Sequence, residues 1–161
     1  MNKEIRIRLA RLSDSTWGMT TDSLHQDVQN FREALDACHS DLDPTVFGHF
    51  PSGCCGTVSE LLAAFLEEQG HGSWPYVCGT RLMEDGQNAT HAWLERDGCI
   101  IDITRDQFDK RQPGLVTADR SWHDERFPDQ EQQEDFGELR SELCDAYARI
   151  KKEIGRGSNA A

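Results

Sequence analysis

Cys55 is the residue whose type and position best suit covalent chemistry in this sequence. It follows Ser52-Gly53 and stands where apolar residues at helical spacing begin. At a helix N-terminus, unpaired backbone N–H groups and the positive end of the helix dipole favour a thiolate, and they lower the pKa of a cysteine below its usual value of about 8.5. A cysteine nucleophile also needs an imidazole that accepts the thiol proton, and a third group that orients this imidazole. The rest of the sequence has to supply both groups.

A predicted β-hairpin carries an imidazole and a carboxylate. Two β-like segments, residues 91–96 and 99–104, flank Asp97-Gly98, a pair that favours a two-residue turn. With that turn, side chains two residues apart share a face, so His91 and Asp102 become diagonal neighbours across the two strands. A slip of one residue in the register would move Asp102 to the opposite face. The hairpin turn therefore predicts a histidine–aspartate pair.

Apolar side chains at helical spacing predict three helices around these residues. The first helix covers residues 22–39 and the third covers residues 129–154. The second begins between Cys54 and Thr57 and ends before Gly70. The segment 155–161 after the last helix is expected to be mobile.

Alternating apolar and polar residues predict the strands of a small antiparallel sheet. The strands are expected at residues 4–10, at residues 74–80 after Pro75, and in the two arms of the hairpin. Residues 40–53, 81–89 and 105–128 are rich in turn-forming or polar residues and are expected to be loops. The sequence thus predicts one α+β domain over residues 1–161, in which the Cys55 helix packs on the sheet and the terminal helices cover the remaining apolar surface.

Between residues 50 and 108 these elements carry an ordered set of motifs. A Gly-x-Cys is followed by a small residue, then by aliphatic and aromatic residues, and then by three strand motifs. In order, the motifs are Gly53-Cys54-Cys55, Ser59, Leu61, Leu62, Phe65, Tyr76-Val77-Cys78-Gly79, His91-Ala92-Trp93-Leu94-Glu95 and Ile101-Asp102-Ile103-Thr104. This set resembles the transglutaminase-like branch of the papain-like cysteine enzymes, and both flanking helical regions lie outside the resemblance.

The resemblance implies a papain-like or transglutaminase-like α+β core and a role for each of three residues. Cys55 would be the nucleophile, His91 the general base and acid, and Asp102 the carboxylate that orients His91. The backbone N–H of Cys55 would help to hold the oxyanion, with a second donor from the loop before the helix. Because the family contains hydrolases, amide-forming enzymes and inactive relatives, the resemblance does not fix the substrate.

Each of these residues also has a plain structural interpretation. Cys55 could be a small core residue, which is what most free cysteines are. His91 could be a strand histidine with satisfied hydrogen bonds, and Asp102 could be a charge on an edge strand. Cys54 lies directly before Cys55, so the choice of nucleophile depends on the register of the helix.

Further residues are candidates for the borders of a substrate site. Trp93, Cys54 and His49 are the candidate substrate-binding residues. The alternatives are a wall of the cleft or core packing for Trp93, packing for Cys54, and a solvent-exposed loop for His49. His123 either borders the cleft or lies in a surface loop.

Composition and charge restrict the classes of partner. The 161 residues are 37% hydrophobic and 29% charged, which is typical of a soluble globular protein. A formal net charge of -12 repels phosphate backbones and anionic lipids, so we expect no nucleic-acid and no membrane partner. No stretch approaches the ~20 apolar residues that a membrane span needs, and the charged N-terminus is a poor secretory signal.

Cysteine usage and ligand motifs narrow the expectation further. Six irregularly spaced cysteines, two of them adjacent, favour reduced thiols and a cytoplasmic location over a disulfide framework. The sequence has no Cys-x-x-Cys or His-x-x-x-His pair for a metal, and no glycine-rich phosphate loop with its lysine. We therefore expect neither a metal nor a cofactor.

Together these observations predict a cysteine-dependent hydrolase or acyltransferase that attacks an amide bond through a thioester. The substrate would be a protein, a peptide or a small amide. Hydrolysis is favoured over transamidation because an open site admits water. The competing prediction is a catalytically inactive interaction module with the same fold, whereas a cell-wall endopeptidase would require export.

Overall fold

A computed structural model describes residues 15–110, 115–133 and 138–158 of this protein, with side chains from residue 21 onward. The strand predicted at residues 4–10 lies outside the described residues. The described chain has the predicted α+β composition, with helices and a five-stranded sheet. None of the described helices is both long enough and apolar enough to cross a bilayer.

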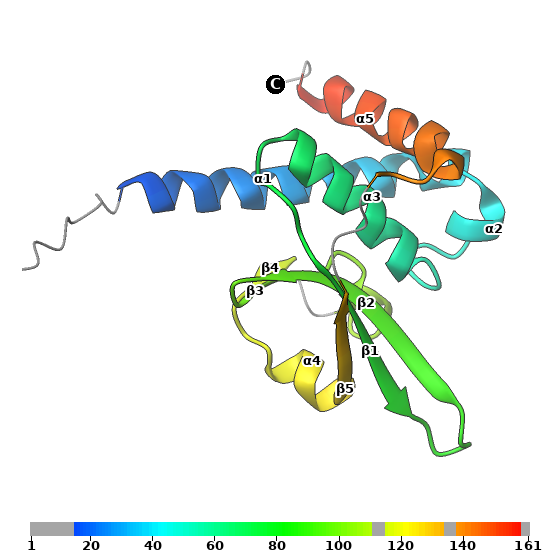
Figure 1. The fold of residues 1–161 in the computed structure, drawn as a ribbon. Coiled ribbons are helices and arrows are strands. Elements are labelled where there is room, and N and C mark those ends of the chain that lie inside the picture. The colour runs from blue at the N-terminus through cyan, green and yellow to red at the C-terminus, as the bar shows by residue number, and fades with distance from the viewer. Residues whose placement is uncertain (1–14, 111–114, 134–137, 159–161) are drawn as a thin grey trace, which may run out of the picture.

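Three helices lie together on one side of the sheet (Figure 1). They are α1 (Ser15–Cys38), α3 (Cys55–Glu68) and α5 (Cys144–Ser158). Helix α1 contacts both α3 and α5, and α3 packs on strand β2 (Asn88–Arg96). Val28, Phe31 and Leu35 are buried, which confirms the apolar stripe predicted for the first helix.

The sheet has the strand order β4-β3-β2-β1-β5, and all neighbouring strands are antiparallel. The other strands are β1 (Tyr76–Leu82), β3 (Cys99–Ile101), β4 (Val116–Thr117) and β5 (Asp129–Gln133). Strand β1 begins directly after Pro75, as predicted, because proline has no backbone N–H to donate to a strand ladder.

The turn between β2 and β3 sets the register of the hairpin. Asp97 and Gly98 have φ values of 53° and 77°, the left-handed backbone that a two-residue type I′ turn requires. Arg96 pairs with Cys99, which confirms the predicted register. The strand ends at Ile101. The backbone N–H of Asp102 still donates to the backbone oxygen of Leu115 at 2.9 Å, and the chain turns at Ile103 and Thr104.

The helix predicted over residues 129–154 is wrong in its first half. Residues 129–133 form the edge strand β5, and the helix begins at Cys144 after a 3-10 turn at Ser141–Leu143. The β5 residues are polar and mostly exposed, so they bury no apolar face, and the open edge of β1 supplies their backbone partners. At the other end, α5 runs through Ser158, so residues 155–158 are helical and do not belong to a mobile tail.

Two segments predicted as loops contain short elements. Residues 40–53 include α2 (Pro44–Phe47), whose start is capped when the side chain of Asp43 accepts from the backbone N–H of Thr45. Residues 105–128 include the 3-10 helix η2 (Arg105–Gln107), strand β4 and helix α4 (Ser121–Arg126). Elements this short span too few residues for an apolar periodicity to reveal them.

The sheet separates two apolar clusters. The main core lies between the sheet and the three long helices, and it includes Phe31, Leu62 and Leu94. Helix α4 lies on the opposite side of the sheet from the three long helices (Figure 1), and its Trp122 packs against the second cluster. We call it the aromatic cluster, and its members are Val77, Trp93, Ile100 and Phe127, with Phe108 and Trp122 packed against them.

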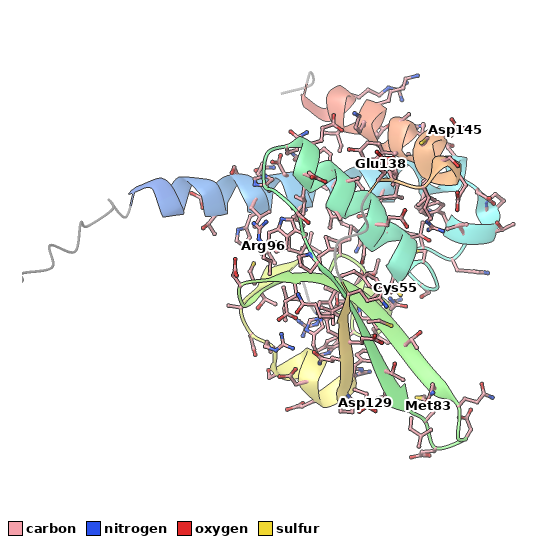
Figure 2. The ribbon with its side chains drawn as sticks, in the orientation of Figure 1. Cys55, Met83, Arg96, Asp129, Glu138 and Asp145 are labelled. Carbon is pink, nitrogen blue, oxygen red and sulfur yellow. The ribbon has the colours of Figure 1, made fainter. Side chains whose placement is uncertain are left out.

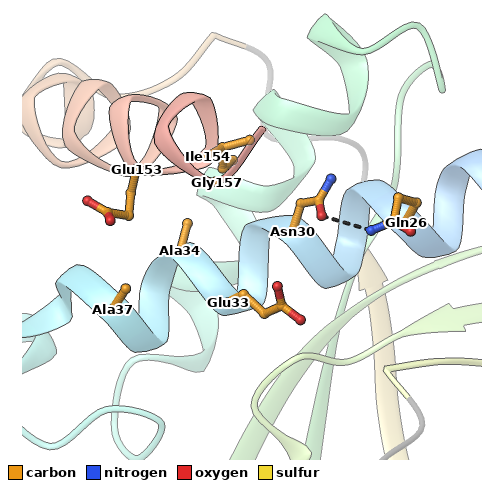
Figure 3. A pocket seen from close by; sticks show the side chains of 8 residues that line it. All are labelled: Gln26, Asn30, Glu33, Ala34, Ala37, Glu153, Ile154 and Gly157. Atoms are coloured by element: carbon orange, nitrogen blue, oxygen red, sulfur yellow. Dashed lines mark hydrogen bonds between the residues drawn. The ribbon is translucent and has the colours of Figure 1, made fainter. Parts of the chain in front are cut away.

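A groove of about 480 Å³ lies between α1 and α5 (Figure 3). Its walls include Asn30 and Glu33 of α1 and Glu153 and Ile154 of α5. None of its lining residues belongs to the segments that carry the candidate site, so the groove is separate from that site.

Candidate functional site

Cys55 is the first residue of α3, which confirms the predicted start of this helix. The chain enters through Gly53, whose φ of 76° lies in the left-handed region that favours glycine, and Cys54 precedes the helix as its N-cap. Figure 2 places Cys55 at the end of α3 that points to the sheet. The residue is partly exposed, so a helix N-terminus and solvent meet at this thiol.

His91 and Asp102 form a buried pair on the sheet. Nε2 of His91 lies 2.8 Å from Oδ2 of Asp102, and the two residues are 0% and 3% exposed. The second carboxylate oxygen, Oδ1, accepts from the backbone N–H of Thr104 at 3.2 Å. Because an ionised carboxylate can only accept, Nε2 of His91 carries a proton and Nδ1 is the nitrogen left for another partner. The predicted contact between His91 and Asp102 is confirmed.

The Cys55 sulfur hydrogen-bonds with the His91 ring. The backbone N–H groups of Ala92 and Gly56 also donate to the sulfur. Burial by itself raises the pKa of the Cys55 thiol. The hydrogen bond and charge of His91, together with the two N–H groups, outweigh burial and lower this pKa below its ordinary value. The arrangement stabilises a thiolate beside an imidazolium.

The charges of His91 and Asp102 support each other. Burial opposes the cationic ring, but the charge and hydrogen bond of Asp102, followed by those of Cys55, raise the pKa of His91 to about 9. Burial also opposes the carboxylate, but the charge of His91 and the hydrogen bonds from His123 and His91 hold the pKa of Asp102 well below its usual range. At neutral pH, His91 is therefore a cation and Asp102 an anion.

A second histidine, His123, donates to the same carboxylate oxygen. Its Nε2 lies 2.9 Å from Oδ2 of Asp102, and the residue is 0% exposed. Helix α4 carries it to this point from the face of the aromatic cluster. The surface-loop interpretation of His123 is therefore wrong. No local pattern reveals this contact, because it joins residues 21 positions apart through the placement of α4.

Aromatic rings surround His91. The ring centroids of Phe108, Phe127 and Trp93 lie 5.0, 5.4 and 5.8 Å from that of His91. Gly79 faces His91 across β1 and β2, and a Cβ atom at Gly79 would lie 2.6 Å from Cβ of Phe127. The close approach leaves no room for a side chain at this position. The apolar surroundings strengthen the electrostatic interactions of the histidine ring.

Gln107 lies beside Nδ1, the nitrogen of His91 that does not contact Asp102, and the sequence contained no signal for this contact. Its Nε2 donates to the backbone oxygen of Thr104 at 2.9 Å and lies 3.4 Å from Nδ1 of His91. The complete burial of His91 therefore involves a polar side chain that is itself only partly buried.

The hydroxyl of Tyr76 is another polar group near the start of α3. It hydrogen-bonds with Cys78, and a Cβ atom at Gly56 would lie 3.6 Å from it. Burial, the charge and hydrogen bond of Cys78, and the charge of Cys55 raise the pKa of Tyr76 to about 12. The hydroxyl is therefore protonated at neutral pH.

The candidate substrate-binding residues have different surroundings. Cys54 is 2% exposed, its Sγ donates to the backbone oxygen of Pro51 at 3.7 Å, and burial raises the pKa of its thiol to about 11. Trp93 is fully buried, and its Nε1 donates to Glu95 at 3.2 Å. Both are packed in the interior, as the packing alternative predicted, and neither is exposed for contact with a substrate. His49 is exposed between α2 and α3.

Within the described part of the chain, no group of three or more His, Cys, Asp or Glu side chains is placed to hold a metal ion. No model of a protein family matches this chain, and no curated protein and no solved structure does. The geometry of the site is therefore what a functional proposal has to rest on.

Proposed function

We propose that this protein is a cysteine-dependent enzyme that acts on an amide or a related acyl carbonyl. The observation that carries the proposal is the chain of contacts from the Cys55 sulfur to the His91 ring and on to Asp102. The sulfur lies at the first residue of a helix, and the imidazole is held 2.8 Å from a buried carboxylate. This is the arrangement that activates a thiol nucleophile.

In the proposed reaction, the Cys55 thiolate attacks the carbonyl carbon. A carbon–sulfur bond forms, and the carbonyl electron pair moves to oxygen, where the N–H of Cys55 at the helix N-terminus is available to stabilise the negative charge. His91 gives its Nδ1 proton to the leaving nitrogen as the carbon–nitrogen bond breaks, and a thioester remains. His91 then takes a proton from water, and the water oxygen attacks the thioester carbonyl. The carbon–sulfur bond breaks as the carbonyl re-forms, which releases the acid and restores the Cys55 thiolate beside the His91 imidazolium.

An amine in place of water would complete transamidation by the same steps. We favour hydrolysis because Cys55 is partly exposed and water has access to it. The substrate class under this proposal is a protein, a peptide or a small amide. The ordered motifs of residues 50–108 support a papain-like or transglutaminase-like core as the framework of the site.

Access to His91 sets a requirement on this mechanism. The ring is 0% exposed, and Gln107 Nε2 lies 3.4 Å from Nδ1. A leaving group that takes the Nδ1 proton must therefore approach beside the sulfur and displace the Gln107 side chain. The same burial is the observation that favours the second candidate, an inactive interaction module in which His91 and Asp102 only stabilise the fold.

Alkylation by iodoacetamide distinguishes the two candidates, with peptide mapping by mass spectrometry to assign each cysteine. Exposed Cys144, the first residue of α5, serves as the internal reference for a thiol outside the candidate site. At pH 6 only about 0.3% of a thiol with a pKa of 8.5 is ionised, so we expect Cys55 to react at least about tenfold faster than Cys144. If Cys55 reacts no faster than Cys144 at pH 6, the enzymatic proposal is wrong.

Two variants make the comparison specific. His91→Ala should reduce the pH 6 rate at Cys55 to that of Cys144, because the imidazolium is lost. His71→Ala is the matched control, since Nε2 of His71 lies 2.7 Å from Oδ2 of Asp27 in a second histidine–aspartate pair outside the candidate site. Its Cys55 should react at the wild-type rate.

A further inference from the structure

We propose that His123 is a positioning residue of this site, which orients Asp102 by donating a hydrogen bond to the carboxylate oxygen that His91 also uses. The proposal rests on the proposed function, because it concerns the group that holds His91 in the catalytic arrangement. It adds a fourth side chain, from a separate helix, to the three that the sequence motifs indicate.

The geometry places both imidazoles on one oxygen. Oδ2 of Asp102 lies 2.8 Å from Nε2 of His91 and 2.9 Å from Nε2 of His123. A carboxylate has about four lone-pair positions, so one oxygen can accept two donors. On the other oxygen, Oδ1, the backbone N–H of Thr104 donates at 3.2 Å and its hydroxyl at 3.5 Å, so both contacts are longer than those to the imidazoles. Without His123, rotation of the carboxylate would be opposed only by Thr104 and by His91 itself.

His123 acts as a hydrogen-bond donor through its Nε2. Its Nε2 must carry a proton to hydrogen-bond with the carboxylate, and its Nδ1 is buried without a hydrogen-bond partner among the described residues. A second proton on Nδ1 would create a buried donor with no acceptor, which is unfavourable. The contact of His123 with Asp102 therefore depends on the proton at Nε2.

Packing holds the His123 ring in this orientation. Its centroid lies 4.6 Å from the Trp93 ring and 4.9 Å from the Trp122 ring, which it meets at 76°. Trp93 also packs on His91, at 5.8 Å between centroids. The two histidines thus share an aromatic neighbour as well as a carboxylate. A substitution at His123 should therefore alter the packing and hydrogen bonding of His91.

Several other charged or titratable groups face this network from neighbouring elements. Asp119, before α4, interacts with His123, and the guanidinium carbon of Arg105 from η2 lies 4.3 Å from the ring centroid of Trp122. Asp124 lies on the same helix as His123.

On the side of the nucleophile, Tyr76 and Cys54 face Cys55. All of these groups are retained in the variants below, so a difference between variants reports the group at position 123.

The test compares three substitutions at position 123 by the pH dependence of iodoacetamide alkylation at Cys55. Glutamine can place its Nε2 where histidine has Nε2, so His123→Gln should keep most of the reactivity. His123→Asn is too short to reach Asp102 in this way, and His123→Leu has no donor. Both should move the alkylation midpoint toward that of Cys144 and slow the pH 6 reaction about tenfold, which corresponds to a shift of about one pH unit.

Thermal unfolding of each variant separates this role from a purely structural one. If His123→Leu and His123→Asn lower the melting temperature but keep the wild-type pH profile at Cys55, His123 only supports the fold and the proposal is overturned. If wild-type Cys55 itself is no more reactive than Cys144, the proposed function fails first. The two failures are therefore distinguishable.

A measurement on the wild-type protein covers the case in which these variants do not fold. Nitrogen NMR of protein labelled in its histidine rings reports which nitrogen carries the proton. We expect a proton at Nε2 of His123 and protons at both ring nitrogens of His91 at neutral pH. A His123 ring protonated at Nδ1 alone would overturn the proposal, because its Nε2 could not donate to Asp102.

Discussion

At the scale of single residues, Asp102 is the group on which the site depends. It is 3% exposed and accepts hydrogen bonds from His91, His123 and the Thr104 backbone. A buried carboxylate is stable only when it is paired and hydrogen-bonded, and these three donors meet that condition. In return, its charge keeps the neighbouring imidazole protonated.

Replacing Asp102 with asparagine should remove this charge and keep the shape of the side chain. We expect Asp102→Asn to slow Cys55 alkylation at pH 6 about tenfold or more, because a neutral amide cannot balance the His91 imidazolium. Asp97→Asn is the matched control: this carboxylate lies on the same hairpin with its side chain 94% exposed, and asparagine tolerates the left-handed φ of 53°. Equal rates in the two variants would contradict a role for the Asp102 charge.

The pH dependence of the free energy of unfolding should reflect the shifted pKa values of His91 and Asp102. Because the folded pKa of His91 is raised to about 9, its contribution is complete below the unfolded value of about 6.5 and is lost as the pH rises through 9. Because the folded pKa of Asp102 is lowered, its contribution is present above its unfolded value of about 3.9 and is lost in more acidic solution.

Urea unfolding across this range provides the measurement. The difference in unfolding free energy between the wild type and Asp102→Asn should be largest between about pH 5 and 6.5, on the order of 3 kcal/mol, and should shrink toward pH 9. A difference that stays constant from pH 5 to 9 would show that His91 is not charged in the folded protein.

The residues of the site differ in whether the local sequence predicts their contacts. Cys55 and the pair of His91 and Asp102 could be predicted, because a helix start and a hairpin turn are local features that fix where side chains point. His123 and Gln107 could not, because their contacts depend on how a short helix and a 3-10 turn fold back on the sheet. Tertiary placement of this kind leaves no periodicity in the sequence.

At the scale of elements, β1 and the aromatic cluster approach each other at Gly79. A Cβ atom there would lie 2.6 Å from Cβ of Phe127 and 2.7 Å from the Trp93 ring. Phe127 directly follows α4, the helix that carries His123. The absence of a side chain at Gly79 therefore lets α4 approach Asp102.

Substituting alanine for Gly79 should force these elements apart. We expect Gly79→Ala to lower the free energy of unfolding by about 1–3 kcal/mol through overpacking, and to reduce the reactivity of Cys55 as well. Gly157→Ala is the control, since nothing lies within 4 Å of a Cβ at that position in α5. The measurements are urea unfolding and alkylation at pH 6, and wild-type values for Gly79→Ala would contradict the close approach.

The error over residues 129–154 also belongs to this scale. Asp129–Gln133 has residue types that a helix accepts, and the periodic apolar positions that predicted the helix lie farther along the chain. The strand forms because β1 offers an unpaired edge, and this condition exists only once the sheet is assembled. Buried Leu143 and Ile150 show where the apolar face of the last helical region begins.

At the scale of the whole molecule, net charge acts on whatever approaches Cys55. The formal net charge is -12, and such a field repels anions at low ionic strength. A charged and a neutral reagent of similar size therefore separate long-range electrostatics from the intrinsic reactivity of the thiolate.

We expect salt to accelerate the reaction of Cys55 with anionic iodoacetate and to leave the reaction with neutral iodoacetamide nearly unchanged. The acceleration should be largest between low salt and about 0.1 M, where the screening length falls to about 10 Å. The measurement is the alkylation rate of Cys55 with each reagent over this range of salt concentration. If iodoacetate slows as salt is added, a local positive field outweighs the charge of the whole protein.

The four side chains that meet at Oδ2 of Asp102 and the Cys55 sulfur come from α3, β2, the segment after β3, and α4. They span residues 55 to 123, so no shorter stretch of the chain contains them all. An emerging polypeptide would therefore carry Cys55 as an ordinary, slowly reacting thiol until α4 has docked. Thiol labelling at pH 6 should then also report when these four groups come together during folding.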